Sequence, residues 1–194
     1  MYAGEKDKTV YVKIFTNENL NKDVEGNASP LKIIFLQLLK KASFEQMDEG
    51  HLDDNFKEYF GSDLLEEYSL MIEPDEIQDF SLDVNPDAKY LGVIMMLREL
   101  NDDWKYLYEK QDLKLFSKKK NYLNLEISED KLVQLNVSEA AKLTLNKQLR
   151  KLEKEGLDVS ILSENSKKKL ETKIKKESIP KAKASLEKGI YKKY

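Results

Sequence analysis

Apolar side chains recur at every second residue in a series of short segments between Thr9 and Ile127, and this alternation constrains the fold more than any other feature. Successive side chains of a β-strand point to opposite faces, so a period of two marks a strand with one buried face. Val10, Val12 and Ile14 give the pattern in the first segment. Short segments of this kind, separated by turn-forming residues, are typical of a two-sheet β-sandwich.

Two segments are apolar on both faces, which predicts central strands that are covered on both sides. They are Leu31–Leu38, preceded by Pro30, and the run YLGVIMMLR from Tyr90 to Arg98. This run is far shorter than the ~18 apolar residues that a membrane-spanning helix requires. The other alternating segments are residues 68–72, 80–84, 104–108 and 123–127.

Residues 43–67 interrupt the alternation. Ser43 and Asn55 are helix N-cap types, and the aromatic residues that follow them are spaced three or four positions apart. We therefore expect one or two short helices inserted into the β framework over residues 43–67.

A second helical region begins at Ser138, which is a suitable helix N-cap. Leucines at helical spacing follow it, and Gly156 is a typical helix stop. A lysine-rich helix is expected from about Ser163 to a point before Pro180. The leucines of the stripe are Leu145, Leu149 and Leu152.

Charge divides the chain at the same place. Residues 138–194 hold 16 Lys and Arg against 8 Asp and Glu, a balance of +8, whereas residues 1–137 have a balance of −11. The net charge of −3 conceals this asymmetry. The sequence thus predicts a β-sandwich domain over residues 8–137 and a basic helical extension over residues 138–194.

The chain has no cysteine and one histidine, His51. Disulfides, thiol catalysis and cysteine-ligated zinc are excluded, and a histidine-based triad or metal site is not expected. Acidic residues surround His51 but lack the spacing of an EF-hand loop, and no common catalytic signature occurs. We predict a protein that is not an enzyme and has no cofactor or metal, an enzyme built on the acidic group being the least favoured alternative. The acidic residues are Asp48, Glu49, Asp53 and Asp54.

Lysine runs at Lys118–Lys120 and Lys167–Lys169 suit an anionic surface or a protein contact. Nucleic-acid sites usually also contain arginine, and the chain has only Arg98 and Arg150. A solvated helical face is the simplest interpretation of the tail, and no nucleic-acid partner is predicted.

The polar segment from Asn17 to Ser29 is too long for a tight hairpin, and long loops on a rigid sheet often carry recognition. A plain connector is the alternative. Trp104, Tyr106 and Tyr108 share one strand face and would form a sugar-binding platform if exposed, although alternating aromatics more often lie in a core.

Several short motifs occur in a characteristic order. In residues 27–48, a polar loop leads into a strand that starts with Pro30 and then into a short helix with a phenylalanine. Farther on come Pro74-Asp75-Glu76, Tyr90-Leu91-Gly92-Val93, Leu97-Arg98 and Trp104-Lys105. Over Lys8 to Leu135 the order resembles the TssJ family, the lipoproteins of the bacterial type VI secretion membrane complex.

The chain departs from the family pattern at three motif positions. Asp75 stands where the family usually has Gly, Leu97 where it has Phe, and Lys105 where Arg is common. The lipidated cysteine of the family is missing, because the sequence has no cysteine. The helical extension is also outside the pattern.

The resemblance implies a transthyretin-like β-sandwich with a small helical insertion and no enzymatic activity. It implies a protein tethered to the outer membrane by an N-terminal lipid anchor and facing the periplasm. The N-terminus itself shows no apolar signal segment, which fits a cytosolic protein or an exported chain after signal removal.

In that family, the loop between the first two strands contacts the periplasmic part of TssM, an inner-membrane protein. By position, the resemblance implies a TssM-like partner for this chain. A carbohydrate-binding or adhesin-like β-sandwich is the alternative function. The implied partner-binding residues are Asn21, Lys22, Asp23, Val24, Glu25, Gly26 and Asn27.

Overall fold

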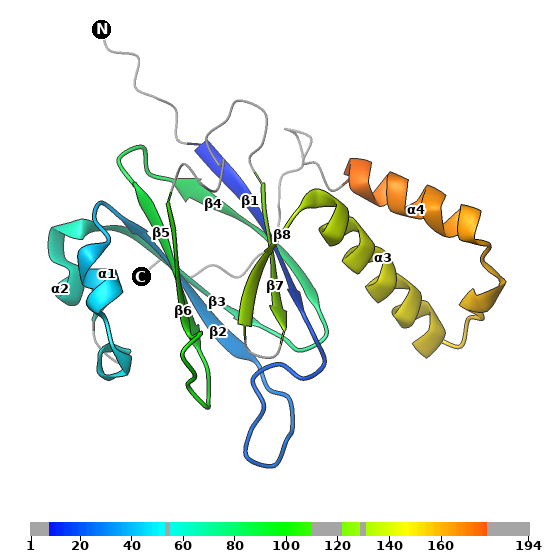
Figure 1. Ribbon diagram of the computed structural model, residues 1–194, viewed down its shortest axis with the longest axis horizontal. Helices are drawn as coiled ribbons and strands as arrows, with labels where there is room; N and C mark the ends of the chain where they lie inside the picture. The colour runs from blue at the N-terminus through cyan, green and yellow to red at the C-terminus, as the bar shows by residue number, and fades with distance from the viewer. Residues whose placement is uncertain (1–7, 53–54, 110–121, 129–130, 178–194) are drawn as a thin grey trace, which may run out of the picture. The chain divides into compact units, whose positions relative to one another are not determined.

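The computed structural model describes residues 8–52, 55–109, 122–128 and 131–177. These residues form two four-stranded β-sheets and four α-helices (Figure 1). The described residues divide into two compact units, one up to Val133 and one from Gln134 onward.

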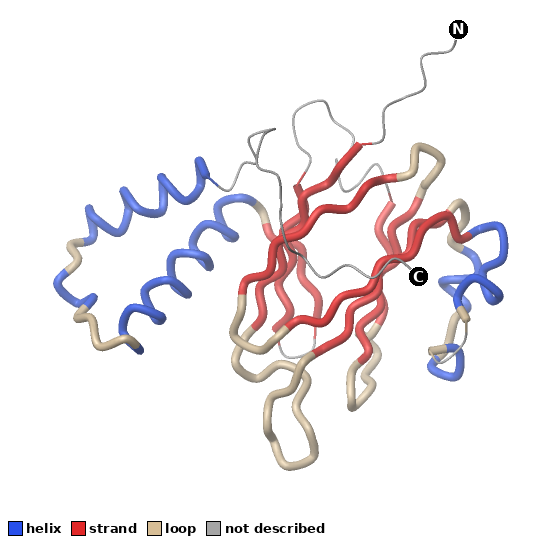
Figure 2. The backbone as a smooth tube through the Cα atoms, turned by 180° about the vertical axis from the view of Figure 1, so that it is seen from behind, coloured by secondary structure: helices blue, strands red, loops and turns tan. Residues whose placement is uncertain are grey.

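The first unit contains the two sheets (Figure 2). Sheet A has the spatial order β4 (Ile77–Val84), β1 (Lys8–Thr16), β7 (Tyr122–Ser128) and β8 (Lys131–Leu135). Sheet B has the order β3 (Leu64–Ile72), β2 (Leu31–Leu38), β5 (Tyr90–Met96) and β6 (Lys105–Glu109). Among the pairings whose register is described, only β1 with β7 is parallel. The mainly β fold with a helical insertion and a helical extension is confirmed.

The two segments that are apolar on both faces become inner strands of sheet B. In β2 every residue except Lys32 is buried, and in β5 the stretch Leu91–Met95 is buried. β2 pairs with β3 on one side and β5 on the other. The prediction of central strands is therefore confirmed, and the run YLGVIMMLR supplies Leu91–Met95 and Leu97 to the buried interior.

One apolar cluster joins the two sheets. The rings of Phe35 in β2 and Phe80 in β4 lie 5.3 Å apart between centroids. Polar bonds add to this contact: the amide of Gln37, which is buried, donates to the Asp83 carbonyl at 2.7 Å and accepts from the Asn85 N–H at 2.8 Å. Because a buried amide group costs free energy unless it is paired, these bonds help to fix the packing of the sheets.

The helical insertion consists of α1 (Ala42–Gln46), η1 (Glu49–His51), α2 (Phe56–Phe60) and η2 (Gly61–Asp63). It ends earlier than the sequence predicted, since β3 begins at Leu64 and residues 64–67 are strand. A register shift opposite Gln37 and Leu38 brings Leu64 into the ladder of β2, and this long-range pairing overrides the local helical pattern.

Phe44 and Lys105 attach α1 to sheet B. The Phe44 ring covers Gly92 of β5, where an added Cβ would lie 2.5 Å from Phe44 Cε2. Lys105 Nζ donates to the carbonyls of Phe44 and Glu45 at 3.0 and 3.1 Å, and also to the carbonyl of Met47. This ammonium group therefore satisfies carbonyls at the C-terminal end of α1, as a cation at a helix C-terminus does.

The second unit is a helical hairpin of α3 (Val137–Lys154), η3 (Val159–Ile161) and α4 (Glu164–Glu177). Gly156, with φ of 84°, follows the end of α3 as predicted. The prediction of Ser138 as N-cap is wrong. Asn136 caps the helix, because its side chain accepts from the Ser138 and Glu139 amides and Glu139 closes a capping box. None of the helices in the described residues is long and apolar enough to span a membrane.

Candidate docking loop

The β1–β2 loop, residues 17–30, extends beyond the ends of the strands that it connects (Figure 1). Its base is held by buried residues: Leu20 is 1% exposed and Ser29 is 7% exposed. The Ser29 N–H donates to the Leu20 carbonyl at 3.0 Å, which joins the two ends of the loop. A leucine inside a polar segment is the sequence signal for this anchored base.

Asn21 is the polar centre of the base. Its φ is 46°, and it is 4% exposed. The side-chain Nδ2 donates to the Pro30 carbonyl at 2.7 Å, and Oδ1 accepts from the Arg98 N–H at 2.8 Å. The Ser29 hydroxyl donates to the Asn21 carbonyl. The base of the loop is thereby bound both to the start of β2 and to the segment after β5.

The tip of the loop is a hydrogen-bonded turn built on Asp23. The Asp23 N–H donates to the Asn27 carbonyl, and the Gly26 N–H donates to the Asp23 carbonyl, both at 2.9 Å. Asp23 Oδ1 accepts from the backbone N–H groups of Glu25 at 3.0 Å and Asn27 at 2.8 Å. These bonds, above all the one from Asn27, hold the pKa of the Asp23 carboxyl below its usual value. Gly26, with φ of 84°, allows the turn to close.

The outer surface of the tip combines an apolar centre with polar neighbours. Val24 is 90% exposed, the most exposed large apolar residue in the described part of the chain. Lys22, Glu25 and Asn27 are exposed around it. An apolar group surrounded by polar groups on an ordered support is the usual arrangement of a protein-binding surface. Of the seven predicted binding residues, the structure thus places Asn21 in the base and the other six in the tip.

Asp48 is the member of the acidic group that contacts the His51 side chain in the described residues. His51 Nδ1 lies 2.6 Å from Asp48 Oδ1, and the His51 ring packs against Tyr59 with centroids 4.4 Å apart. Asp53 and Asp54 lie outside the described residues. In the part of the chain that is described, no group of three or more His, Asp or Glu side chains is arranged to hold a metal ion.

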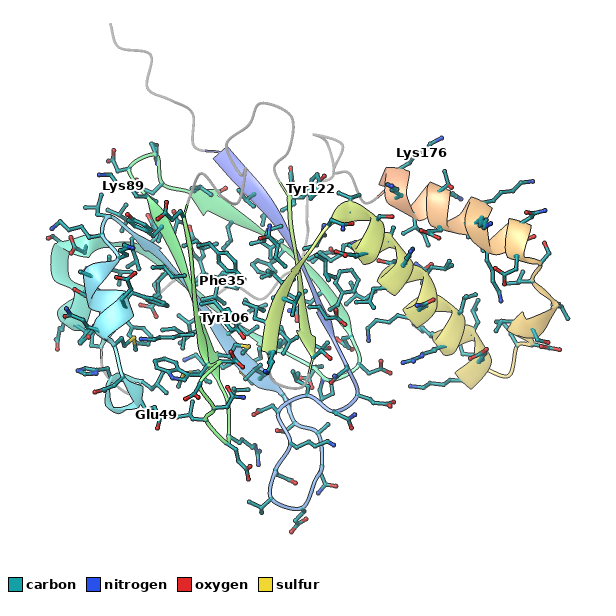
Figure 3. All side chains as sticks on the ribbon, viewed as in Figure 1. Phe35, Glu49, Lys89, Tyr106, Tyr122 and Lys176 are labelled. Carbon is teal, nitrogen blue, oxygen red and sulfur yellow. The ribbon has the colours of Figure 1, made fainter. Side chains whose placement is uncertain are left out.

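The aromatic residues of the β6 segment pack on the core cluster rather than forming a platform. Tyr106 of this strand is labelled in Figure 3. Trp104 is 6% exposed, and Tyr106 and Tyr108 are half-buried and pack on the core cluster. The Tyr106 hydroxyl accepts from the Leu132 N–H of β8 at 2.9 Å, which links the two sheets. Burial raises the pKa of Tyr108 to about 12, with a further contribution from Tyr106. The alternative of an aromatic sugar-binding platform is therefore disfavoured.

The structure describes one of the two lysine runs. Lys167–Lys169 lie in α4, where Lys167 pairs with Glu164 at 3.5 Å, whereas Lys118–Lys120 lie outside the described residues. The sequence analysis used Arg98 only as part of a family motif. In the structure its backbone N–H donates to Asn21 Oδ1 in the base of the loop. The two residues are 77 positions apart, so only the fold brings them together.

The sequence profile of the T6SS-SciN family, the type VI secretion lipoproteins that include VasD, EvfM and TssJ, matches residues 8–140. The chain belongs to this family. A search among curated protein sequences found no match. The family assignment confirms the resemblance to TssJ and the prediction of a structural protein rather than an enzyme.

Solved structures of type VI secretion proteins share the fold. TssJ1 of Pseudomonas aeruginosa is 21% identical, with a TM-score of 0.58 over 66% of this chain and 95% of that chain. Serratia marcescens Lip is 20% identical, with a TM-score of 0.57 over 66% and 97%. A chain from a structure described as a type VI membrane complex is 20% identical, with a TM-score of 0.60 over 68% and 100%. About two thirds of this chain thus align with nearly the whole of each of these structures, and the remaining third has no counterpart in them.

Proposed function

We propose that this member of the type VI secretion lipoprotein family is a non-catalytic component of a secretion membrane complex. In this proposal it docks the periplasmic domain of a TssM-like inner-membrane protein through its β1–β2 loop. The observation that carries the proposal is the loop itself. It is fixed at its base by Leu20, Asn21 and Ser29, and it presents Val24 to solvent at 90% exposure.

Order and exposure together favour binding. A mobile loop would lose conformational entropy on binding, whereas a loop already held by hydrogen bonds loses less. The bonds of Asp23 with Glu25, Gly26 and Asn27 give the tip this order. An apolar side chain as exposed as Val24 gains free energy when a partner covers it.

The proposed location is the periplasmic face of the outer membrane, with a lipid anchor carried by the precursor. The support is family membership, since the matched family is one of lipoproteins. Fractionation of cells that express the complete native gene, with labelling by a lipoprotein acyl donor, tests this location. Recovery in the cytosolic fraction without label would contradict it.

A pull-down tests the docking. The periplasmic domain of the TssM-like protein from the same secretion system is incubated with the wild-type chain and with a variant in which residues 22–27 are replaced by Gly and Ser. We expect the wild type to retain the partner and the variant to lose it. The matched control is Met71→Ser in β3, because Met71 is also an exposed apolar residue, at 53%, but lies outside the loop. Equal retention of partner by the loop variant and the wild type would refute the loop assignment.

A further inference from the structure

Asn21 differs from the rest of the candidate binding residues because its side chain lies inside the protein. It is 4% exposed, whereas Val24 in the tip is 90% exposed. We infer that Asn21 is a positioning residue, which does not touch the partner but holds the β1–β2 loop in the conformation that binds. This inference rests on the proposed docking function.

The backbone of Asn21 sets the direction of the loop. Its φ of 46° is in the left-handed region, which residues with a side chain seldom adopt and in which asparagine is enriched. Leu20 before it points into the core and Lys22 after it is exposed. The residue at position 21 is therefore where the chain leaves the sandwich to form the tip.

The side chain of Asn21 fixes this turn from two sides. Nδ2 donates to the Pro30 carbonyl at 2.7 Å, which joins the two ends of the loop at its base, just before β2. Oδ1 accepts from the Arg98 N–H at 2.8 Å, which connects the base of the loop to the segment that follows β5. The Asn21 backbone carbonyl also accepts a hydrogen bond from the Ser29 hydroxyl. Because the Asn21 side chain that makes these bonds is 4% exposed, its removal leaves the Pro30 carbonyl and the Arg98 N–H without their partner in a site that water reaches poorly.

The orientation of the tip depends on the bonds in the base of the loop. The hydrogen bonds described for the tip join Asp23, Glu25, Gly26 and Asn27 to one another, whereas the bonds of Asn21 in the base connect that turn to the sandwich. Removal of the Asn21 amide should therefore leave the turn intact and the base held by the two Ser29 bonds alone, so that the turn changes its orientation more easily. A partner would then have to order the loop during binding, which lowers affinity.

The test compares Asn21→Gly with Gln37→Leu in the full chain. Glycine keeps the left-handed backbone available, so the change removes the side-chain bonds without adding strain. Gln37 is the matched control, because it is also a buried amide with two backbone partners, Asp83 and Asn85, but lies at the other end of β2. Hydrogen exchange of the loop amides is measured without partner, and association kinetics are measured with the TssM-like periplasmic domain.

We expect exchange at the amides of Ser29 and Arg98 to accelerate about tenfold or more in Asn21→Gly, as the loss of a net hydrogen bond or two implies. We expect partner affinity to fall by a similar factor. Gln37→Leu should change neither quantity in the loop, although it lowers the melting temperature. Unchanged loop exchange in Asn21→Gly would overturn the inference, and so would an equal loss of affinity in Gln37→Leu. If the wild type binds no partner, the docking proposal fails, while the exchange measurement still decides whether Asn21 orders the loop.

Discussion

The ring of Phe44 lies directly on the backbone of Gly92, so that α1 is packed against β5 without any intervening side chain. A Cβ at position 92 would be 2.5 Å from Phe44 Cε2 and 2.9 Å from Cδ2, closer than carbon atoms can approach. Phe44 is 2% exposed and also stacks on Phe60, with centroids 6.4 Å apart. The glycine in the Tyr-Leu-Gly-Val motif is thus explained by the close approach of the helical insertion.

Gly92→Ala should destabilise the sandwich by about 1–3 kcal/mol, the usual cost of overpacking a tight core. Chemical denaturation of the variant and the wild type measures the change. The same substitution in a Phe44→Leu background should cost clearly less, because the smaller side chain leaves room for the new methyl group. An equal cost in both backgrounds would show that Phe44 is not the cause.

Lys105→Met should destabilise the helical insertion by about 1–3 kcal/mol, since it removes a charged donor from the carbonyls of Phe44, Glu45 and Met47. Lys105 Nζ also lies over the Trp104 ring, 5.2 Å from its centroid, so that methionine, which has a side chain of similar length, loses this cation–π contact as well. Hydrogen exchange of α1 amides and denaturation curves give the measurement. Lys105→Arg is the control, because a guanidinium keeps the donors. Equal loss of stability in both variants would contradict the capping role.

The strands were predictable because one face of each had to be buried. Val10, Val12 and Ile14 are all nearly inaccessible, and the doubly apolar segments became inner strands. The cap of α3 was also readable: Asn136 is followed three residues later by Glu139, the spacing of a capping box, and this was a better signal than Ser138.

The position of the candidate loop was predictable from the sequence. Which of its residues lie in the buried base and which in the exposed tip was not. A polar asparagine in a polar segment gives no sign that it is buried, because its partner Arg98 is 77 residues away. The beginning of β3 was missed for the same physical reason, since its register with β2 depends on a distant strand. Contacts of this kind depend on the fold and have no local pattern.

Tyr108 should titrate at about pH 12, because burial disfavours the phenolate, and spectrophotometric titration of the wild type and Tyr108→Phe identifies its contribution. The folded pKa is above the unfolded value of 10.0, so the folded state retains a proton that the unfolded state loses. The free energy of unfolding should therefore fall as pH rises from about 10 to about 12, and less steeply in Tyr108→Phe. An ordinary tyrosine titration at position 108 would contradict the buried environment.

Asp23 should titrate below its usual value of 3.8, because its carboxylate accepts backbone hydrogen bonds from Asn27 and Glu25. A carboxyl group with a lowered folded pKa stabilises the fold above its unfolded pKa. This contribution is lost as pH falls through the lowered folded value. We expect the order of the loop tip to decline only in that acidic range, as followed by NMR of the Asp23 carboxyl carbon and the loop amides. Asp23→Asn removes the titration, and a midpoint at or above 3.8 in the wild type would contradict the hydrogen-bonded turn.

Site-specific photo-crosslinking tests the central claim most directly. A photoreactive phenylalanine analogue is placed at Val24 in the loop tip or at Met71 in β3, both of which are exposed apolar positions. Each protein is irradiated with the TssM-like periplasmic domain, and crosslinked products are identified by mass. The account predicts a crosslink from position 24 and none from position 71. A complex that forms without any crosslink from position 24, while position 71 reacts, would contradict docking through the β1–β2 loop.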